Sequence, residues 1–222
     1  MRPGPAVSPP PSAPRIAVVD YGAGNLRSVA RALVRSGLEP DVTGDPAAVR
    51  AADGVVLPGV GAFADAMAHL AEKGLDDAVC ERIAAGRPYL GLCLGLQVLF
   101  EESDEHGVTP GLALLAGRVE RFPAPGTPGA PPRVPHIGWN TVRFRGDHPM
   151  TRALPAEDAY YFVHSYRAVP SDDAIVAGSV DYGAPFAAAV AVDNVFAVQF
   201  HPEKSQDAGR RLLDAFAAWV AG

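Results

Sequence analysis

The first half of the chain alternates short apolar runs with segments of helical spacing. The runs at 15–20, 54–57 and 88–92 are too short for helices and predict strands buried inside a sheet. The segments between and after them predict helices at 25–36, 62–73, 75–85 and 94–102. Alternating strands and helices are typical of a parallel sheet covered on both faces.

The second half changes to short strands separated by turn signals such as Asp181-Tyr182-Gly183 and Asp193-Asn194. Strands are expected at 119–122, 142–144, 160–163, 174–180, 186–192 and 195–200. A closing helix is expected at 208–220, and the Pro- and Gly-rich stretch 123–135 predicts a mobile surface loop. We therefore expect a single α/β domain with a central, mostly parallel sheet flanked by helices and an antiparallel extension.

The N-terminal segment 1–14 is rich in Pro and Ser and lacks the apolar centre of a secretory signal. We interpret it as a disordered extension that precedes a domain at 15–222. No apolar run in the chain approaches the roughly 20 residues that a membrane helix needs, so we expect no membrane association.

Composition narrows the function classes. The net charge of −6 argues against a basic surface that binds nucleic acid. Two cysteines are too few for a disulfide framework, and they suit a reducing, cytoplasmic environment. The sequence leaves a Cys80–Cys93 bridge open, but Cys80 is expected to be a buried structural thiol on a helix. No His, Cys, Asp and Glu cluster has metal-binding spacing, so we expect no metal.

Cys93 lies between Gly91 and Gly95, directly after an apolar run and directly before a helix-forming segment. This spacing is the nucleophile elbow, with Cys in place of Ser. Glycines are needed there because a Cβ would collide within the tight turn. A thiol at a helix N-terminus is also favoured as a thiolate by the helix dipole and the free N–H groups.

A second candidate group follows far downstream, in Phe200-His201-Pro202-Glu203. Side chains two positions apart in an extended segment point to the same side, so His201 and Glu203 can act together. With Cys93 they form a candidate Cys-His-Glu triad. The alternatives are a buried structural thiol and a simple turn at a strand end.

Several further segments carry a family resemblance. They are VVDYGAGNLRSV at 18–29, LPGVGAF at 57–63, YLGLCLGLQVLFEES at 89–103, PHIGWN at 135–140, YYFVHSY at 160–166 and AVQFHPEKSQ at 197–206. With these segments the chain resembles the class I (triad) glutamine amidotransferases. Within them it is most similar to the glutaminase subunits of imidazole glycerol phosphate synthase, a family of histidine biosynthesis.

The resemblance implies that Cys93 attacks the side-chain carbonyl of glutamine and releases ammonia, leaving a thioester that water cleaves to glutamate. An oxyanion forms on the way, and the amide of Leu94 is one donor by the geometry of the elbow. The second donor is implied to be the Gly59-Val60 peptide, on a strand end that can flip because glycines flank Val60. No cofactor is implied.

Other roles come from the resemblance alone. Substrate contacts are implied for Gln97, Glu105, Ser165 and Tyr166. The implied partner is a separate (βα)₈-barrel cyclase subunit, which forms a heterodimer with this chain and uses the ammonia to make imidazole glycerol phosphate and AICAR. Contacts with that partner are implied for Asn25, Trp139, Tyr161 and Lys204.

Some alternatives stay open. His136, His164 and Trp139 are either packing residues or parts of a functional face, and Lys204 is either a contact or a solvated charge. Asp20-Tyr21-Gly22-Ala23-Gly24 suggests a dinucleotide site, but Arg27 occupies the position of the third glycine, which argues against it. The chain could instead serve a pyridoxal phosphate, aminobenzoate or GMP synthase, or be an inactive binding subunit.

Overall fold

The computed structural model describes residues 14–222, so the predicted disordered extension lies, except for Pro14, outside the described residues. The thirteen strands of this part form one sheet. The start of the domain at residue 15 stays a prediction.

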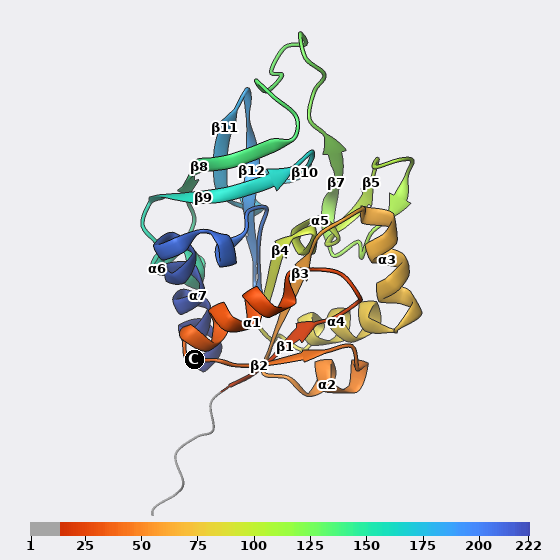
Figure 1. Cartoon of the computed structure of the whole chain (residues 1–222), viewed down its shortest axis with the longest axis vertical. Helices are drawn as coiled ribbons and strands as arrows, with labels where there is room; N and C mark the ends of the chain where they lie inside the picture. Colours follow the sequence, from red (N-terminus) through yellow and green to blue (C-terminus); the bar gives the residue numbers. More distant parts are fainter. Residues whose placement is uncertain (1–13) are drawn as a thin grey trace, which may run out of the picture.

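The parallel half of the sheet comes mostly from the N-terminal part of the chain (Figure 1). Its strands run in the order β2, β1, β3, β4, β13, and all four neighbouring pairs are parallel. These strands are β1 (Arg15–Val19), β2 (Glu39–Thr43), β3 (Gly54–Gly59), β4 (Tyr89–Cys93) and β13 (Val195–Val198).

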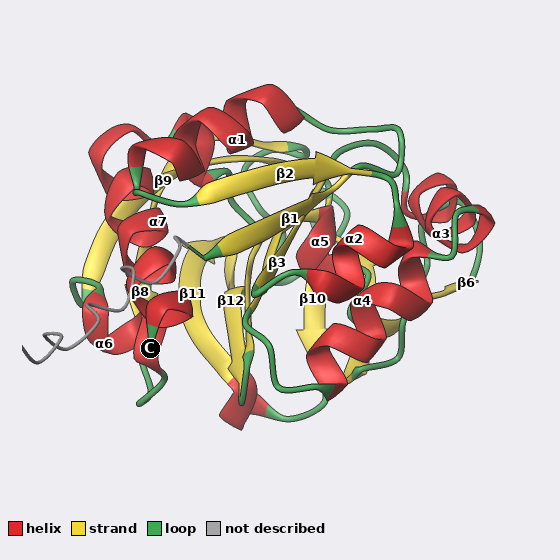
Figure 2. Ribbon diagram, turned by 90° about the horizontal axis from the view of Figure 1, so that it is seen from below, coloured by secondary structure: helices red, strands yellow, loops and turns green. Residues whose placement is uncertain are grey.

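Helices cover both faces of this parallel half (Figure 2). α1 (Leu26–Arg35) and α7 (Gln206–Ala221) pack on one face, while α2 (Pro46–Ala51), α3 (Phe63–Glu72) and α4 (Leu75–Ala84) pack on the other. In β1, Ile16 and Val18 belong to the first core cluster, and Ala17 and Val19 belong to the second. Successive side chains point to opposite faces, so a strand buried on both sides needs an uninterrupted apolar run.

The antiparallel extension begins at the long strand β12, next to β13, and rises above the parallel half (Figure 1). From β12 the sheet continues through β10, β7, β5 and β6, while β11 leads to β8 and β9. The bounds are β5 (Phe100–Ser103), β6 (Thr109–Pro110), β7 (Leu115–Arg121), β8 (His136–Phe144), β9 (Glu157–His164), β10 (Tyr166–Pro170), β11 (Val176–Tyr182) and β12 (Ala184–Val192). Four short helices complete the described part of the chain: α5 (Leu94–Gln97), α6 (Pro149–Ala153), η1 (Asp173–Ile175) and η2 (Pro202–Lys204).

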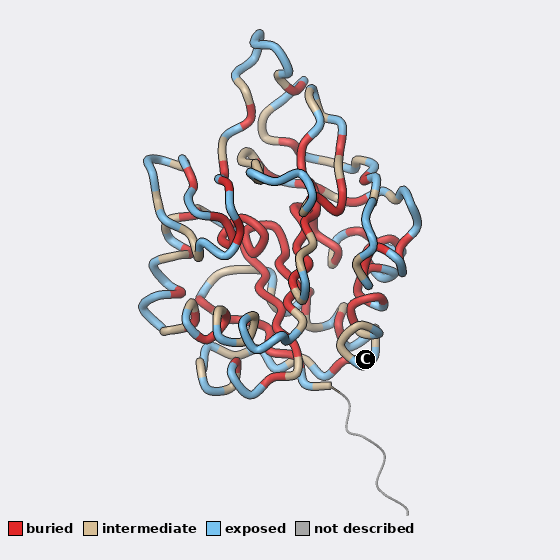
Figure 3. The backbone as a smooth tube through the Cα atoms, turned by 180° about the vertical axis from the view of Figure 1, so that it is seen from behind, coloured by how far each residue is buried: buried red, intermediate tan, exposed pale blue. Residues whose placement is uncertain are grey.

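The buried segments gather along the sheet and under the helices, whereas the stretch 123–135 projects as an irregular, mostly exposed loop (Figure 3). The predicted fold class is confirmed: the fold is α/β, with a mostly parallel centre and an antiparallel extension. Within residues 14–222 no helix is long and apolar enough to cross a membrane.

The predicted helix at 94–102 is wrong beyond Gln97. The helix ends there, and residues 100–103 form β5, which pairs with β7 and β6. Phe100 and Ser103 are buried while Glu101 and Glu102 are exposed. Pairing at the sheet edge therefore outweighs the local helix preference of this segment.

Three further differences have local causes. β2 was not predicted because it is an edge strand with mostly exposed residues, Glu39-Pro40-Asp41-Val42-Thr43, and so carries no apolar run. The expected strand at 174–180 starts only at Val176, after the single turn η1. Cys80 lies on α4 as expected but is half-buried rather than buried, and both cysteines are free, which excludes a bridge between them.

The turn from β4 into α5 fits only glycine at Gly95, because a Cβ there would collide with the carbonyl oxygen of Leu57 on β3. Gly95→Ala should therefore lower the free energy of unfolding by at least about 2 kcal/mol, measured by urea denaturation. The matched control is Gly37→Ala. That position has a positive φ of 81° but open space around it, so only backbone strain of about 1 kcal/mol is expected. Equal losses in the two variants would contradict this packing.

Candidate active site

The carboxyl ends of β3 and β4 lie side by side, with Gly59 directly opposite Cys93 in the register. β13 is the neighbour on the other side of β4, and the chain reaches His201 three residues after β13 ends. Ligands of open α/β sheets bind at this edge. The fold thus brings together three segments that are far apart in the sequence.

Cys93 occupies a strained turn. Its φ of 55° and ψ of −102° are rare for a residue with a side chain, and its side chain is buried. A Cβ at Gly91 would collide with the Gly95 carbonyl, which confirms that the elbow needs its glycines for space. The turn places the thiol at the N-cap of α5, as expected for the nucleophile of an elbow.

His201 and Glu203 are joined by a hydrogen bond of 2.9 Å between Nδ1 and Oε1. Both side chains are almost fully buried, at 4% and 3% exposure. The second ring nitrogen, Nε2, has no well-aligned hydrogen-bond partner among the described residues. Burial alone lowers the pKa of His201, but the nearby Cys93 sulfur and the Glu203 carboxylate outweigh it and raise that pKa to about 9.

A contact of the sulfur was not anticipated from the sequence. The side-chain amide of Gln199 donates from Nε2 to Cys93 Sγ at 3.5 Å, and Gln199 is fully buried. A polar residue two positions before His201, in the otherwise apolar run Val195 to Phe200, was the available signal.

A cavity of about 460 Å³ opens in front of Cys93. Most of the predicted catalytic and substrate-binding residues line it, together with residues from the antiparallel extension. The lining residues are Val60, Gly61, Cys93, Leu94, Gln97, Glu105, Pro135, Val163, His164, Ser165, Tyr166, His201 and Lys204. This volume lies in the usual range of small-molecule sites.

The candidate oxyanion segment, Gly59-Val60, borders two different cavities. Val60 is partly exposed and faces the main cavity, whereas Gly59 is buried and borders a narrow space shared with Asn25, His201 and Glu203. The buried Tyr21 hydroxyl would lie 2.8 Å from a Cβ at Gly59. Gly61 has a φ of 98°, a conformation that favours glycine. The strand end therefore tolerates no side chain at Gly59.

Two predicted substrate-binding residues already have protein partners. Gln97 uses both amide hydrogens, donating to Tyr166 O at 3.1 Å and to Gln199 Oε1 at 3.0 Å. Its carbonyl oxygen is left for a substrate N–H. Glu105 accepts the backbone N–H of Phe63 at 2.7 Å, at the start of α3, through one carboxylate oxygen. The other oxygen of Glu105 is left for a cation in the cavity.

Ser165 and Tyr166 line the cavity, and their backbone carbonyls already have protein partners. The carbonyl of Ser165 accepts the N–H of Phe122, and that of Tyr166 accepts from Gln97 and from the ring of His164. His164 lines the cavity and His136 lies behind it, both buried. Burial lowers the pKa of His136 to about 4 and that of His164 to about 3, so both rings are neutral at pH 7.

Three of the four predicted interface residues lie together beside the cavity mouth. Trp139 and Tyr161 face each other across β8 and β9, with ring centroids 6.2 Å apart. Lys204 Nζ lies 6.0 Å from the centre of the Tyr161 ring. Asn25, by contrast, precedes α1 and borders the narrow space behind the triad. In residues 14–222 no group of three or more His, Cys, Asp or Glu is placed to hold a metal ion.

Comparisons with known proteins agree on one family. The model of the family "Glutamine amidotransferase class-I" matches residues 17–218. The chain is 54% identical over 209 residues to "Imidazole glycerol phosphate synthase subunit HisH" of Methylococcus capsulatus, covering 92% of this chain and 96% of that protein. It is 50% identical over 210 residues to the protein of the same name from Aromatoleum aromaticum, covering 92% and 98%.

Solved structures share the fold at lower identity. A structure titled "Crystal structure of glutamine amidotransferase" matches with a TM-score of 0.73 at 21% identity, over 93% of this chain and 99% of that one. "Structure of PurLQS from Thermotoga maritima" matches with a TM-score of 0.69 at 21% identity, over 94% and 99%. At this identity the likeness concerns the fold alone.

The electrostatics of the triad can be measured directly. Because the Cys93 sulfur and the Glu203 carboxylate both raise the pKa of His201, Cys93→Ala and Glu203→Gln should each lower that pKa below about 9. The measurement is a pH titration of the imidazole ¹⁵N and ¹³C resonances. His164, which stays neutral, is the internal control. A His201 pKa near its ordinary value of 6.5 in the unchanged protein would contradict the geometry.

The raised pKa of His201 also makes the free energy of unfolding depend on pH. The folded-state pKa of His201 lies above the ordinary value, so its contribution is fully present below about pH 6.5 and is lost as the pH rises through 9. The free energy of unfolding should fall over this window, and the fall should be smaller in His201→Asn. A parallel fall in the two proteins would assign the pH dependence to other groups.

Proposed function

Because this chain belongs to the class-I glutamine amidotransferases, and within them to the HisH subunits of imidazole glycerol phosphate synthase, we propose that it hydrolyses glutamine and delivers ammonia to a cyclase subunit. The observation that carries the proposal is the buried His201–Glu203 pair, whose free ring nitrogen adjoins Cys93 on the wall of the cavity. The ammonia is used to make imidazole glycerol phosphate and AICAR in histidine biosynthesis.

The first chemical step uses the triad. His201 takes the proton of the Cys93 thiol through Nε2, and the resulting imidazolium is stabilised by Glu203 at Nδ1. The thiolate attacks the side-chain carbonyl carbon of glutamine and forms a C–S bond. His201 then gives its proton to the departing nitrogen, and ammonia leaves a γ-glutamyl thioester. Water, deprotonated by His201, cleaves the thioester to glutamate and restores the thiol.

Substrate binding follows from the groups left unpaired around the cavity. The free oxygens of Glu105 and Gln97 are acceptors suited to the α-ammonium and amide hydrogens of glutamine. The amide of Leu94 serves as one oxyanion donor, and the Gly59-Val60 peptide serves as the second. Loss of one such donor typically lowers the rate about 10²- to 10³-fold.

A contact surface for the cyclase lies beside the cavity. Ile137 is paired with Val163, and Trp139 with Tyr161, across β8 and β9. Ile137 and Trp139 are about half exposed, at 52% and 49%. Val163 and Lys204 line the cavity as well as this surface, so a partner seated here would cover the cavity mouth. Covering it would keep ammonia from the solvent, which is the reason to place the (βα)₈-barrel cyclase on this face as a heterodimer.

The alternatives have less support. The HisH relatives are about 50% identical over nearly the whole chain, whereas the structural neighbours that serve other synthases share only the fold. An inactive binding subunit has no need of a strained elbow and a buried His–Glu pair beside the thiol.

Replacing the nucleophile should separate the two half-reactions. In the complex with its cyclase subunit, Cys93→Ala should abolish glutamine-dependent formation of imidazole glycerol phosphate and leave ammonia-dependent formation unchanged. The assay compares product formation with glutamine and with ammonium salt as nitrogen donor. Retained glutamine-dependent activity would rule out Cys93 as the nucleophile. Loss of both activities would indicate a defective cyclase subunit, and gel filtration of the variant complex checks that the two subunits stay associated.

The contact surface can be tested by affinity. Trp139→Ala should raise the Kd for the cyclase subunit by about tenfold or more, because exposed aromatic side chains at the centre of an interface often dominate binding. The control is Val108→Ala, an exposed apolar residue of the loop between β5 and β6, for which no change is expected. Calorimetric titration gives both values, and equal affinities would place the partner elsewhere.

A further inference from the structure

A continuous chain of hydrogen bonds connects strand β8 with the sulfur of Cys93. It passes from Asn140 through His136, His164, the carbonyl of Tyr166, Gln97 and Gln199. The two histidine and two glutamine side chains in it are all buried, between 0% and 7% exposed. An unpaired buried polar group would cost stability, so the bonds of this network hold each of these side chains in a defined orientation.

The Tyr166 carbonyl fixes the direction of every bond, because a carbonyl oxygen only accepts. Gln97 must therefore present its NH₂ to Tyr166, and the same group donates to Gln199 Oε1. This leaves Gln199 with its NH₂ toward Cys93 Sγ, at 3.5 Å. The sulfur thus faces an N–H donor, which favours a thiolate over a thiol.

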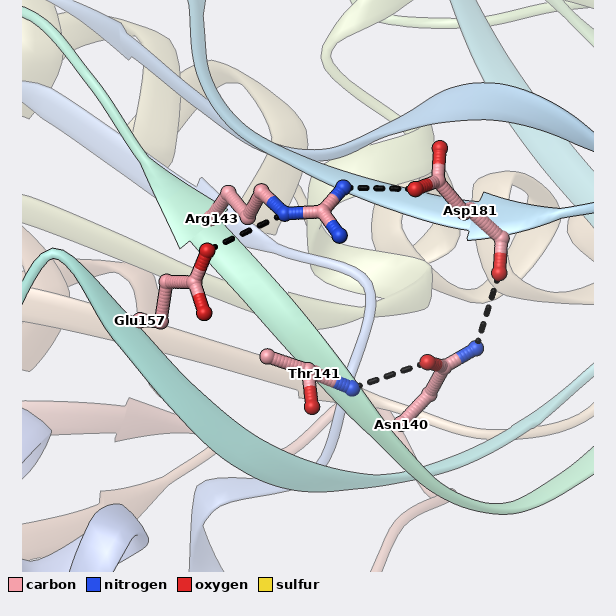
Figure 4. A network of polar contacts seen from close by, with 5 residues as sticks. All are labelled: Asn140, Thr141, Arg143, Glu157 and Asp181. Atoms are coloured by element: carbon pink, nitrogen blue, oxygen red, sulfur yellow. Dashed lines mark hydrogen bonds and ion pairs between the residues drawn. The ribbon is translucent and has the colours of Figure 1, made fainter.

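The other branch from the same carbonyl is equally determined. His164 must carry its proton on Nδ1 to reach Tyr166 O at 2.8 Å, so a neutral His164 accepts at Nε2. His136 then donates from Nδ1 at 3.0 Å and accepts at Nε2 from Asn140 at 3.3 Å. The orientation of Asn140 is set independently, because its Oδ1 accepts Thr141 N and its Nδ2 also donates to Asp181 O (Figure 4).

We propose that Gln199 is a further catalytic residue, whose amide N–H stabilises the Cys93 thiolate, and that Gln97 and the neutral His136–His164 pair are positioning residues that hold this N–H toward the sulfur. The inference rests on the proposed function. It gives the thiolate a second stabilising group besides the His201 imidazolium. It also explains why Gln97 offers only its carbonyl oxygen to a substrate.

The test measures the thiolate without glutamine or partner. The rate of alkylation by iodoacetamide is followed against pH, and the adduct at Cys93 is quantified by mass spectrometry of its peptide. The other titratable side chains that face the thiol or its cavity are His201 after β13, Tyr21 after β1, His164 at the end of β9, and Glu105, Tyr166 and Lys204 on the cavity wall. Tyr21, with a pKa that burial raises to about 12, and the neutral His164 do not titrate between pH 5 and 8.

Two variants distinguish the effect of losing the N–H donor from the effect of adding a negative charge. Gln199→Met removes the donor at similar volume, and Gln199→Glu keeps an acceptor for Gln97 but turns an oxygen toward the sulfur. Both should shift the midpoint of alkylation to higher pH and lower the rate at pH 7, by about tenfold for Gln199→Met and more for Gln199→Glu. Gln206→Glu, which adds the same charge at an exposed position on α7, is the matched control and should behave as the unchanged protein.

Each outcome decides the proposal. A midpoint unchanged in folded Gln199→Met overturns it, and so does a shift seen only in Gln199→Glu, which would reflect the new charge alone. As a second measurement, ¹⁵N resonances should show His136 and His164 as neutral Nδ1–H tautomers at pH 7. An Nε2–H tautomer of His164 would also overturn it. Because alkylation needs no turnover, a chain that alkylates as expected but releases no glutamate would refute only the proposed glutaminase function.

Discussion

The sharp turn at Cys93 is the constraint on which the site depends. The backbone of Cys93 is held at a φ of 55° because β3, β4 and α5 pack closely around it. They approach one another so closely that Gly91 and Gly95 admit no Cβ. The turn lifts the sulfur out of the sheet at the edge where β3 ends, and it points the sulfur toward the segment that follows β13. Packing of the central sheet therefore stabilises a local conformation that the chain would not adopt by itself.

Three buried histidines, His136, His164 and His201, lie in or beside the site that holds this sulfur. Burial works against any charge there, and it lowers the pKa of both His136 and His164. His201 is the exception, because its neighbours Cys93 and Glu203 raise its pKa despite burial. One histidine is thus prepared to carry a proton while two others nearby stay neutral. The difference comes from the neighbours of each ring: the Cys93 sulfur and a carboxylate for His201, and a carbonyl or another imidazole for the other two.

Much of this could be predicted from the sequence where the signal is local. The apolar runs of β1, β3 and β4, the spacing of Gly91, Cys93 and Gly95, and the spacing of His201 and Glu203 each lie within a few residues. The edge strand β2 could not be predicted because it has no apolar run. The end of α5 could not be predicted because the next residues, β5, pair with β7, which lies more than ten residues further along the chain. Gln199 and the His136–His164 pair could not be assigned roles, because the contacts between the two histidines and from Gln199 to Gln97 and Cys93 span 28 to 106 residues of sequence.

The central claim is that Cys93 is the nucleophile that bonds to the side-chain carbon of glutamine. A diazo ketone analogue of glutamine tests it directly, with the site of attachment read by mass spectrometry. The account predicts one adduct per chain, on Cys93 and not on the half-buried Cys80, and protection by added glutamine. An adduct on Cys80, or none on Cys93 in the folded protein with its cyclase subunit bound, would contradict it.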